Sequence, residues 1–249
     1  MKSALRVFGL LLLAVLALQL YFVIRVAVMA IMAPESTSFE RSQAWQIVSE
    51  KGRLPWQQQW VPYAQISDNL KRAVIASEDD GFSTHGGVDW DAINKAWDKN
   101  AKAEQRAAAR KPTAPQAATN AKLPKPPKVI GGSTITQQLA KNLFFAGERS
   151  LLRKGQELVV TLLLEQFLSK ERILEIYLNH VEWGAGVFGA EAAAQHYFRK
   201  PASKLNVYEA ARLAVMLPRP RYFEKLPNSA YVAGRAGVIV GRMADAQLP

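Results

Sequence analysis

The feature that most constrains this chain is a long apolar run close to its N-terminus. Residues 7–24, VFGLLLLAVLALQLYFVI, contain one polar side chain, Gln19, and the apolar run resumes over residues 26–33. About 20 apolar residues in a helix cross the hydrocarbon core of a bilayer. The run is longer than the apolar part of a cleaved signal peptide, and Pro34 follows it directly. The sequence therefore predicts an uncleaved transmembrane anchor within residues 1–33.

The residues around this run set its expected orientation and surroundings. Lys2 and Arg6 precede it, and basic residues beside a span favour the cytoplasmic side of the membrane. We therefore expect a cytoplasmic N-terminus, with everything after Pro34 outside. The chain has no cysteine, so an oxidising compartment poses no folding problem, and its three histidines are too scattered for a zinc site.

Beyond the anchor the pattern is mainly helical. Residues 34–66 are polar and turn-rich, and we expect them to form a membrane-proximal linker. Its tryptophans either sit at the level of the lipid headgroups or pack on the main domain. From residue 67 onward, apolar side chains recur at helical spacing, strand alternation is nearly absent, and no internal repeat occurs. Residues 67–249 are therefore expected to form one mainly α domain.

One segment, residues 99–128, has a different composition. It holds nine Ala, five Pro and eight Lys or Arg against one acidic residue, and eight minus one gives +7 of the chain's formal net charge of +11. Its first third is expected to extend the preceding helix, and the rest to form a flexible basic insert. A solvated linker explains this composition, and so does a cationic arm attracted to an anionic membrane surface. Nucleic acid is a poor alternative partner, and none is expected, because the anchor places this arm on the other side of the membrane.

Three acids gather in SEDDGFSTHGG, residues 77–87. Glu78, Asp79 and Asp80 lie in the last turn of a predicted helix that Gly81 ends, where the helix dipole already disfavours negative charge. Adjacent carboxylates repel one another, which raises at least one pKa. The three acids do not stabilise the end of this helix, so the cluster indicates a catalytic role.

A second motif, GGSTITQQLAKN, covers residues 131–142. Thr134 and Gln137 form a capping box that predicts a helix start, and the glycines before it leave backbone N–H groups free to face an anion. Lys141 lies two turns further along. Taken alone this is a weak signal, because most capped helices bind nothing.

A third motif, ERSLLRKGQE, is basic. Arg149, Arg153 and Glu157 are spaced to share one helix face, with Lys154 adjacent. A solvated face with one intrahelical ion pair would explain it. However, the residues that follow, LVVTLLLEQFL, predict a largely buried helix. A cationic cluster with one glutamate at its entry suits a diphosphate, or a divalent ion shared between Glu157 and that diphosphate.

Glu78 and Glu157 thus flank a basic, glycine-led anion site in the sequence. Paired carboxylates are typical of sugar transfer, in which one handles a proton and the other acts on the opposite side of the anomeric carbon. The basic cluster indicates that the leaving group carries phosphate, which simple glycan hydrolysis does not require.

Together the motifs resemble a known family. EDDGFSTHGG, GGSTITQQLAKN, RKGQE and KERILEIYLN, in this order, are similar to the successive motifs of glycosyltransferase family 51, the peptidoglycan glycosyltransferases that polymerise lipid II. GVFGAEAAAQHYF and RLAVMLPRP continue the match, which runs from about residue 60 to about residue 245. The length, the single anchor and the missing second domain make the chain most similar to the family's monofunctional members.

The resemblance implies a role for each matching residue. Glu78 would be the base that deprotonates the acceptor's 4-hydroxyl group, with Asp79 supporting it and Phe82, His85 and Gly87 shaping the turn. Glu157 would assist departure of the diphosphate, directly or through a metal. The substrate-binding residues implied are Asp79, Ser133, Thr134, Gln137, Gln138, Lys141, Arg149, Arg153 and Lys154.

The resemblance also implies a fold and a setting. We expect a lysozyme-like helical glycosyltransferase domain after an N-terminal transmembrane helix, held periplasmically at the bacterial inner membrane, that inverts the anomeric carbon. No organic cofactor is implied, and a divalent ion, Mg²⁺ or Mn²⁺, at Glu157 is left open. The implied partners are lipid II, the growing lipid-linked glycan chain and the membrane, and contacts with other cell-wall synthesis or division proteins are left open.

Three alternatives remain beside this reading. A lytic enzyme that cleaves the glycan explains one glutamate but neither the basic cluster nor the anchor. A bifunctional penicillin-binding protein is disfavoured because no Ser-x-x-Lys or Lys-Thr-Gly occurs. A non-catalytic anchored scaffold does not need intact acids and bases.

Two features depart from the family pattern. The insert at 99–128 is longer than expected, and His180, which follows IYLN, is not a residue that the pattern predicts. We expect His180 and His196 to be structural.

Overall fold

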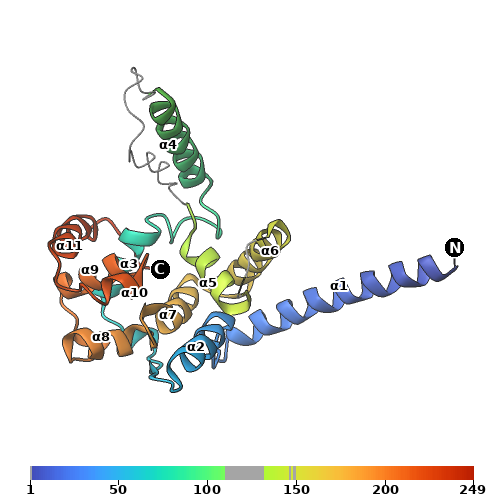
Figure 1. Cartoon of the computed structure of the whole chain (residues 1–249), viewed down its shortest axis with the longest axis horizontal. Coiled ribbons are helices and arrows are strands. Elements are labelled where there is room, and N and C mark those ends of the chain that lie inside the picture. Colours follow the sequence, from blue (N-terminus) through green and yellow to red (C-terminus); the bar gives the residue numbers. More distant parts are fainter. Residues whose placement is uncertain (1, 110–131, 146, 148–149) are drawn as a thin grey trace, which may run out of the picture. The chain divides into compact units, whose positions relative to one another are not determined.

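A computed structural model describes residues 2–109, 132–145, 147 and 150–249. The described chain is mainly helical, as the sequence predicts, with three very short strands (Figure 1). Its elements are α1 (Lys2–Met29), α2 (Ser38–Lys51), β1 (Gln57–Gln58), the 3₁₀ turn η1 (Tyr63–Gln65), α3 (Asp68–Glu78), α4 (Trp90–Ala109), α5 (Ile135–Phe144), α6 (Leu151–Phe167), α7 (Lys170–His180), β2 (Glu182–Gly184), β3 (Val187–Phe188), α8 (Ala190–Phe198), η2 (Ala202–Lys204), α9 (Val207–Met216), α10 (Pro220–Phe223) and α11 (Ala230–Arg242).

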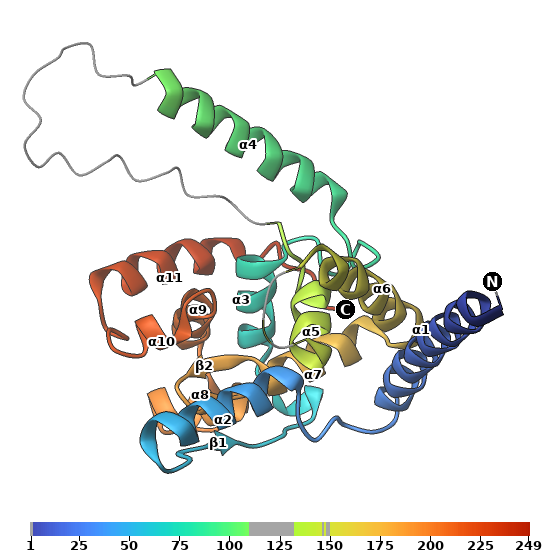
Figure 2. The same ribbon diagram turned by 45° about the vertical axis from the view of Figure 1, so that its right-hand side comes forward.

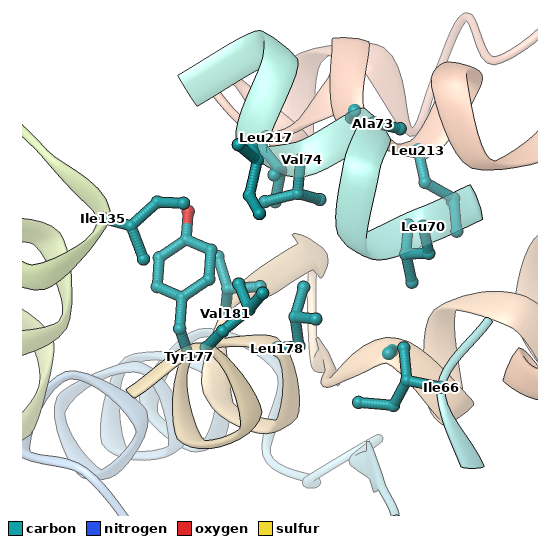
Figure 3. Packing of buried hydrophobic residues seen from close by; sticks show 14 of the residues in the cluster. Ile66, Leu70, Ala73, Val74, Ile135, Tyr177, Leu178, Val181, Leu213 and Leu217 are labelled. Atoms are coloured by element: carbon teal, nitrogen blue, oxygen red, sulfur yellow. The ribbon is translucent and has the colours of Figure 1, made fainter. Parts of the chain in front are cut away.

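The chain divides into two compact units. The larger comprises residues 1–87 and 134–249, and the smaller comprises residues 88–133. In the larger unit, α3, α9 and α11 pack against one another (Figure 2). Apolar side chains from α3, α5, α7 and α9 meet in its core, among them the fully buried Leu70, Ile135 and Leu213 (Figure 3). These helices form where apolar residues recur every three to four positions, because that spacing gives each helix one face to bury.

A three-stranded sheet in the order β1-β3-β2 joins the segment after the anchor to the middle of the domain. β1 runs parallel to β3, and β2 runs antiparallel to it. The turn between β2 and β3 contains Gly186, whose φ of +83° and close approach to Pro55 leave no room for a side chain: an added Cβ would lie 2.1 Å from the Pro55 oxygen. Strands of two or three residues are too short for an alternating pattern, so the sequence did not predict them.

The expected linker at residues 34–66 contains more structure than its composition suggests. α2 begins at a capping box in which Thr37 and Glu40 exchange hydrogen bonds, and it contacts α5. Trp56 stacks on Phe188 with ring centroids 4.4 Å apart, whereas Trp45 is 76% exposed. Of the two positions considered for these tryptophans, the lipid headgroups or the main domain, Trp56 takes the second.

The anchor helix α1 is long and apolar enough to cross a membrane, with a mean hydropathy of 2.6 over its most apolar stretch. Its C-terminal part packs on the domain. Phe22 is buried against Phe144, with ring centroids 5.2 Å apart. The side-chain amides of Gln19 and Gln156 donate to each other's oxygens at 3.0 and 3.1 Å, which joins α1 to α6. The one polar residue of the first apolar run therefore has a partner.

The prediction that α6 is largely buried was wrong. Only Glu157, Val160, Thr161 and Leu164 are buried on this helix. Its other apolar side chains, such as Leu162 at 51% exposed, form an outward surface on a helix that contacts α1. Apolar composition alone did not show which of these side chains the rest of the protein covers, because folded proteins also expose apolar surface.

The smaller unit contains α4. The helix begins just after Asp89, whose carboxylate accepts a hydrogen bond from the Ala92 N–H at 2.7 Å. It continues to Ala109, which confirms that the first third of the basic insert extends the preceding helix. The rest of the insert, residues 110–128, lies outside the described residues.

Candidate functional site

Glu78 is the last residue of α3. Ser67 caps the N-terminus of the helix, since its hydroxyl accepts from the Asn69 N–H, and the apolar face of the helix is buried against α9. The Glu78 carboxylate accepts a hydrogen bond from the Gln138 side chain on α5 at 3.0 Å. A buried helix therefore fixes the position of the backbone, and a neighbouring helix fixes the direction of the carboxylate.

Asp79, the next residue, connects three parts of the site. One carboxylate oxygen lies 2.8 Å from His85 Nε2, and the other accepts from the backbone N–H of Ile135, the first residue of α5, at 2.9 Å. His85 Nδ1 accepts from the Gly87 N–H at 3.1 Å, so Nε2 carries the proton and donates to Asp79. Asp79 is 7% exposed and thus serves as a buried anchor for the Glu78 motif.

Gln138 is held by a residue that sequence reasoning missed. The Tyr177 hydroxyl, on α7, donates to the Gln138 side-chain oxygen at 3.2 Å, which leaves the amide N–H free to donate to Glu78. Burial, together with the charges of Glu78 and Asp79, raises the pKa of Tyr177 well above 10, so it remains a donor. An aromatic residue on a predicted helix is usually a core residue, and nothing in the sequence indicated that Tyr177 also contacts Gln138.

The pKa of Glu78 is raised above its ordinary value. Burial is the largest cause, and the Asp79 charge acts in the same direction. The hydrogen bond from Gln138 and the charge of Lys141 oppose the shift. A carboxylate with a raised pKa is a stronger base than an exposed one, which suits it to accept a proton near neutral pH.

Gly87 brings the Glu78 motif against α6. Its φ is +84°, and an added Cβ would lie 2.8 Å from the Glu165 side chain and 2.9 Å from that of Thr161. Glu165 in turn accepts from the Thr136 hydroxyl at 2.6 Å and pairs with Lys170 at 2.8 Å. The family resemblance implies that Gly87 shapes the turn, and its close approach to α6 gives a physical reason. Neither Thr136 nor Glu165 was predicted.

The capping box of α5 is confirmed. Thr134 and Gln137 exchange the two predicted hydrogen bonds, and the Thr134 hydroxyl also donates to the Gly87 carbonyl at 2.6 Å. Both side chains are buried, so in this structure they hold the start of α5 to the Glu78 motif. Lys141 is exposed on the same helix. Ser133 is also exposed and belongs to the smaller unit.

A second cluster lies at the start of α6. Ser150 caps the helix, and the Lys154 ammonium group lies 2.5 Å from the carboxylate of Glu157, which is 4% exposed. Arg153 has a buried Nε that bonds to no described residue. One intrahelical ion pair therefore exists, between Lys154 and Glu157, as the alternative of a solvated face would have it. Arg149 lies outside the described residues.

No group of three or more acidic, histidine or cysteine side chains within the described ranges is arranged to hold a metal ion. Glu157 offers one carboxylate and already faces an ammonium group. Mg²⁺ commonly binds through one or two carboxylates with substrate phosphates supplying further oxygens, so this donor set fits a metal only when a diphosphate is present.

Comparison with known proteins decides the family. The family model described as Transglycosylase matches residues 46–109 and 111–244. The chain belongs to the transglycosylase family. It is 53% identical over 234 residues to the biosynthetic peptidoglycan transglycosylase of Burkholderia ambifaria, covering 94% of this chain and 86% of that protein. It is 49% identical over 237 residues to the protein of the same name from Herminiimonas arsenicoxydans, covering 95% and 93%. The resemblance seen in the motifs is thereby confirmed over most of the chain.

Proposed function

We propose that this transglycosylase polymerises peptidoglycan glycan strands from lipid II, with Glu78 as the general base. The observation that carries the proposal is the Glu78 carboxylate, whose pKa is raised by burial and which is oriented by Gln138. The names of its relatives support glycan polymerisation. The assignment of lipid II rests on the resemblance of the motifs and on the membrane anchor.

The reaction balances as a displacement. Glu78 takes the proton of the acceptor's 4-hydroxyl group as the oxygen attacks the donor's anomeric carbon from the face opposite the lipid diphosphate. The new carbon–oxygen bond forms, the bond to the diphosphate breaks, and its electron pair leaves with the diphosphate. The α-linked donor thus becomes a β-1,4-linked unit, and Glu78 later returns its proton to solvent.

The leaving group is assigned to the start of α6. Arg153 and Lys154 offer guanidinium and ammonium donors to the diphosphate, and Arg149 is assigned there from the motif alone. Binding of the diphosphate would draw Lys154 away from Glu157, which lies 2.5 Å from it. Glu157 would then be free to assist departure or to bind Mg²⁺ or Mn²⁺, and such an ion would neutralise the charge that develops on the leaving oxygens.

The substrate's lipid tail sets the location. We assign α1 as a single span of the bacterial inner membrane, with a cytoplasmic N-terminus and a periplasmic catalytic domain. The outward apolar surface of α6, on a helix that contacts α1, would place the diphosphate cluster close to the lipid. Lipid II and the growing glycan chain are then the substrates, and other cell-wall synthesis or division proteins could be reached through the anchor.

The proposal is tested with the purified full-length chain in liposomes supplied with labelled lipid II. Wild type should form lysozyme-sensitive polymer and release lipid diphosphate, and Glu78→Gln should lower the turnover number about 10²- to 10⁴-fold. Asp80→Asn is the matched control, since this neighbouring side chain is 63% exposed and 3.4 Å from Arg242. Cleavage of preformed glycan without synthesis would indicate a lytic enzyme, and neither activity in any variant would indicate a scaffold.

A further inference from the structure

One face of the anchor helix α1 packs on the catalytic domain. Phe22, Val26 and Met29 are buried at helical spacing, and Gln19, one turn before Phe22, is partly covered. Residues 2–18, by contrast, are all exposed. Ten residues separate Gln19 from Met29, which corresponds to about 15 Å of helix, whereas the hydrocarbon core of a bilayer is about 30 Å thick. The packed face therefore extends well into the predicted span.

The deepest point of this face is a pair of side-chain amides. Gln19 and Gln156 each donate to the other's oxygen, at 3.0 and 3.1 Å, where α1 lies against α6 (Figure 2). An amide carries both a donor and an acceptor, so two facing amides satisfy each other. Water does not compete for these groups inside hydrocarbon, and an unpaired amide there is costly. The pair therefore favours one position of α6 along α1.

The same face of α1 contacts both sides of the segment that carries the basic motif. Phe22 packs on Phe144, the last residue of α5, and Gln19 bonds to Gln156 near the start of α6. The sequence between these two contacts, residues 145–155, contains the three basic residues assigned to the diphosphate, Arg149, Arg153 and Lys154. The anchor thus holds both ends of the segment that forms the proposed diphosphate site.

The start of α6 has little other support. Leu151 and Leu152 are 92% and 89% exposed. Within residues 150–156, the Gln156 amide makes the only hydrogen bond to another described element. Glu157 follows Gln156 directly, and Arg153 lies one turn before it, so a shift of Gln156 would move both of these side chains.

We infer that Gln19 is a positioning residue for the diphosphate site. It does not touch the substrate, but its bond to Gln156 fixes the start of α6 relative to the membrane in which the substrate's lipid lies. The outer part of the anchor then belongs to the substrate-binding machinery and is more than a tether. The inference rests on the proposed function, because that function assigns the start of α6 to the lipid diphosphate.

The test compares Gln19→Leu with wild type, as full-length chains in liposomes. Two quantities are measured: the Kd for a polyprenyl diphosphate, and the KM and turnover number with lipid II. Loss of the amide pair should raise both Kd and KM about three- to tenfold. The turnover number should stay within about twofold, since the surroundings of Glu78 are unchanged. Ser3→Leu is the matched control, because it also makes α1 more apolar but lies far from the domain contact.

A double-mutant cycle shows whether the effect belongs to the pair. Gln156→Leu alone should match Gln19→Leu, and the variant with both changes should lose no more affinity than either one. A general loss of folding would instead lower the melting temperature and the turnover number together. Additive losses in the cycle would overturn the pair as the cause.

A cross-link provides the rescue. The chain has no cysteine, so Gln19→Cys with Gln156→Cys introduces the only two thiols. Joining them with a short, reducible bifunctional thiol reagent should restore the wild-type Kd, and reduction should weaken binding again. Tyr21→Cys with Gln156→Cys is the control and should not be joined, since Tyr21 is 52% exposed and lies on the other side of α1.

An unchanged Kd in Gln19→Leu and in the unjoined double-cysteine variant would overturn the inference. The binding measurement also separates it from the proposed function. If wild type bound the polyprenyl diphosphate but made no polymer, the proposed function would fail, and the Kd values of the variants would still decide the role of Gln19.

Discussion

The two glutamates of the candidate site lie in contrasting surroundings. Glu78 is fixed from outside its own helix: Gln138 of α5 donates to it, and Tyr177 of α7 holds Gln138 in turn. The carboxylate of Glu157 is hydrogen-bonded by Lys154 of its own helix, whose side chain is 57% exposed. One carboxylate is therefore held by contacts among three helices, and the other by one largely exposed cation of its own helix.

This difference matches the chemistry proposed for each. A general base must lie within hydrogen-bonding distance of one proton and have a suitable pKa, so its position and surroundings must be fixed before the substrate arrives. A diphosphate is bound mainly by charge, and long flexible cations adapt to it. The comparison predicts that substitutions around Glu78 affect both folding and turnover, whereas substitutions around Glu157 affect mainly substrate affinity.

The largest loss of stability is expected for Asp79→Ala. This change removes a buried carboxylate that accepts from His85 and from the first N–H of α5, and it leaves both donors unpaired. Breaking a buried pair of this kind costs about 3 kcal/mol of unfolding free energy. Thermal and denaturant unfolding in detergent would measure it, and activity should fall together with stability.

Asp80→Ala is the matched control for that change. Asp80 belongs to the same acidic trio but is exposed, so its substitution should change the free energy of unfolding by less than about 0.5 kcal/mol. If the two alanine variants were equally stable, Asp79 would not be the buried anchor of the Glu78 motif, and the contrast between the two regions would fail.

The next largest effect is expected for Gly87→Ala. The new Cβ would lie 2.8 Å from the Glu165 side chain at a positive φ, and we expect overpacking to cost about 1–3 kcal/mol. Gly86→Ala tests the specificity of this effect, because nothing lies within 4 Å of a Cβ at that position. Comparing the melting temperatures of the two variants measures the difference. Similar destabilisation by both would mean that the approach of this turn to α6 is not tightly packed.

Much of this region was predictable from the sequence. Glu78 and Asp79 were proposed, and the capping box of α5 was predicted, because their signals are local: three adjacent acids, and a Thr and a Gln three residues apart. Tyr177, Thr136 and Glu165 were missed because their roles depend on contacts between helices far apart in the sequence. Helical spacing predicts on which side of its helix such a residue lies, but it does not identify the residue that it contacts.

The same reasoning explains two other differences between the sequence-based expectations and the structure. Residues 38–51 were assigned to a linker because α2 buries only Glu40 and Ile47, too few residues for a clear apolar stripe. The helix α6 was expected to be buried because its residues are mainly apolar, although folded proteins also expose apolar side chains. In both regions the outcome depends on which other parts of the protein pack against the helix, and the local sequence does not show this.

Lys154→Gln is expected to affect folding less than the substitutions around Glu78 do. Its main effect should be on the affinity for lipid II. The side chain is mostly exposed, so unfolding should become easier by at most about 1 kcal/mol. Loss of one charge-assisted hydrogen bond to the diphosphate should raise the KM for lipid II about tenfold, with a smaller change in the turnover number. Lys51→Gln, an exposed residue at the end of α2, is the control. A loss confined to the turnover number would place Lys154 in the chemical step instead.

The smallest and most specific effect is expected for Gln138→Leu, in the pH dependence of the rate. The hydrogen bond from Gln138 favours the charged form of Glu78 and so opposes the rise in pKa caused by burial. Its loss should raise the Glu78 pKa further and move the acid limb of the pH–rate profile to higher pH. Tyr177→Phe leaves the Gln138 amide in place and should shift the limb less. A shift to lower pH in Gln138→Leu would contradict the assignment of Glu78 as the base.

The same pKa has a consequence for stability. Because the folded state raises the pKa of Glu78 above its unfolded value, the folded protein binds that proton more tightly. The resulting stabilisation is present at low pH and is lost as the pH rises through the folded pKa, so above that pKa the ionised, buried Glu78 destabilises the fold. Glu78→Gln should therefore melt above wild type at neutral pH, with a difference that shrinks on acidification, while it loses activity. If the variant melted below wild type at neutral pH, the carboxylate would be stabilised by its surroundings, and the contrast with Glu157 would rest on geometry alone.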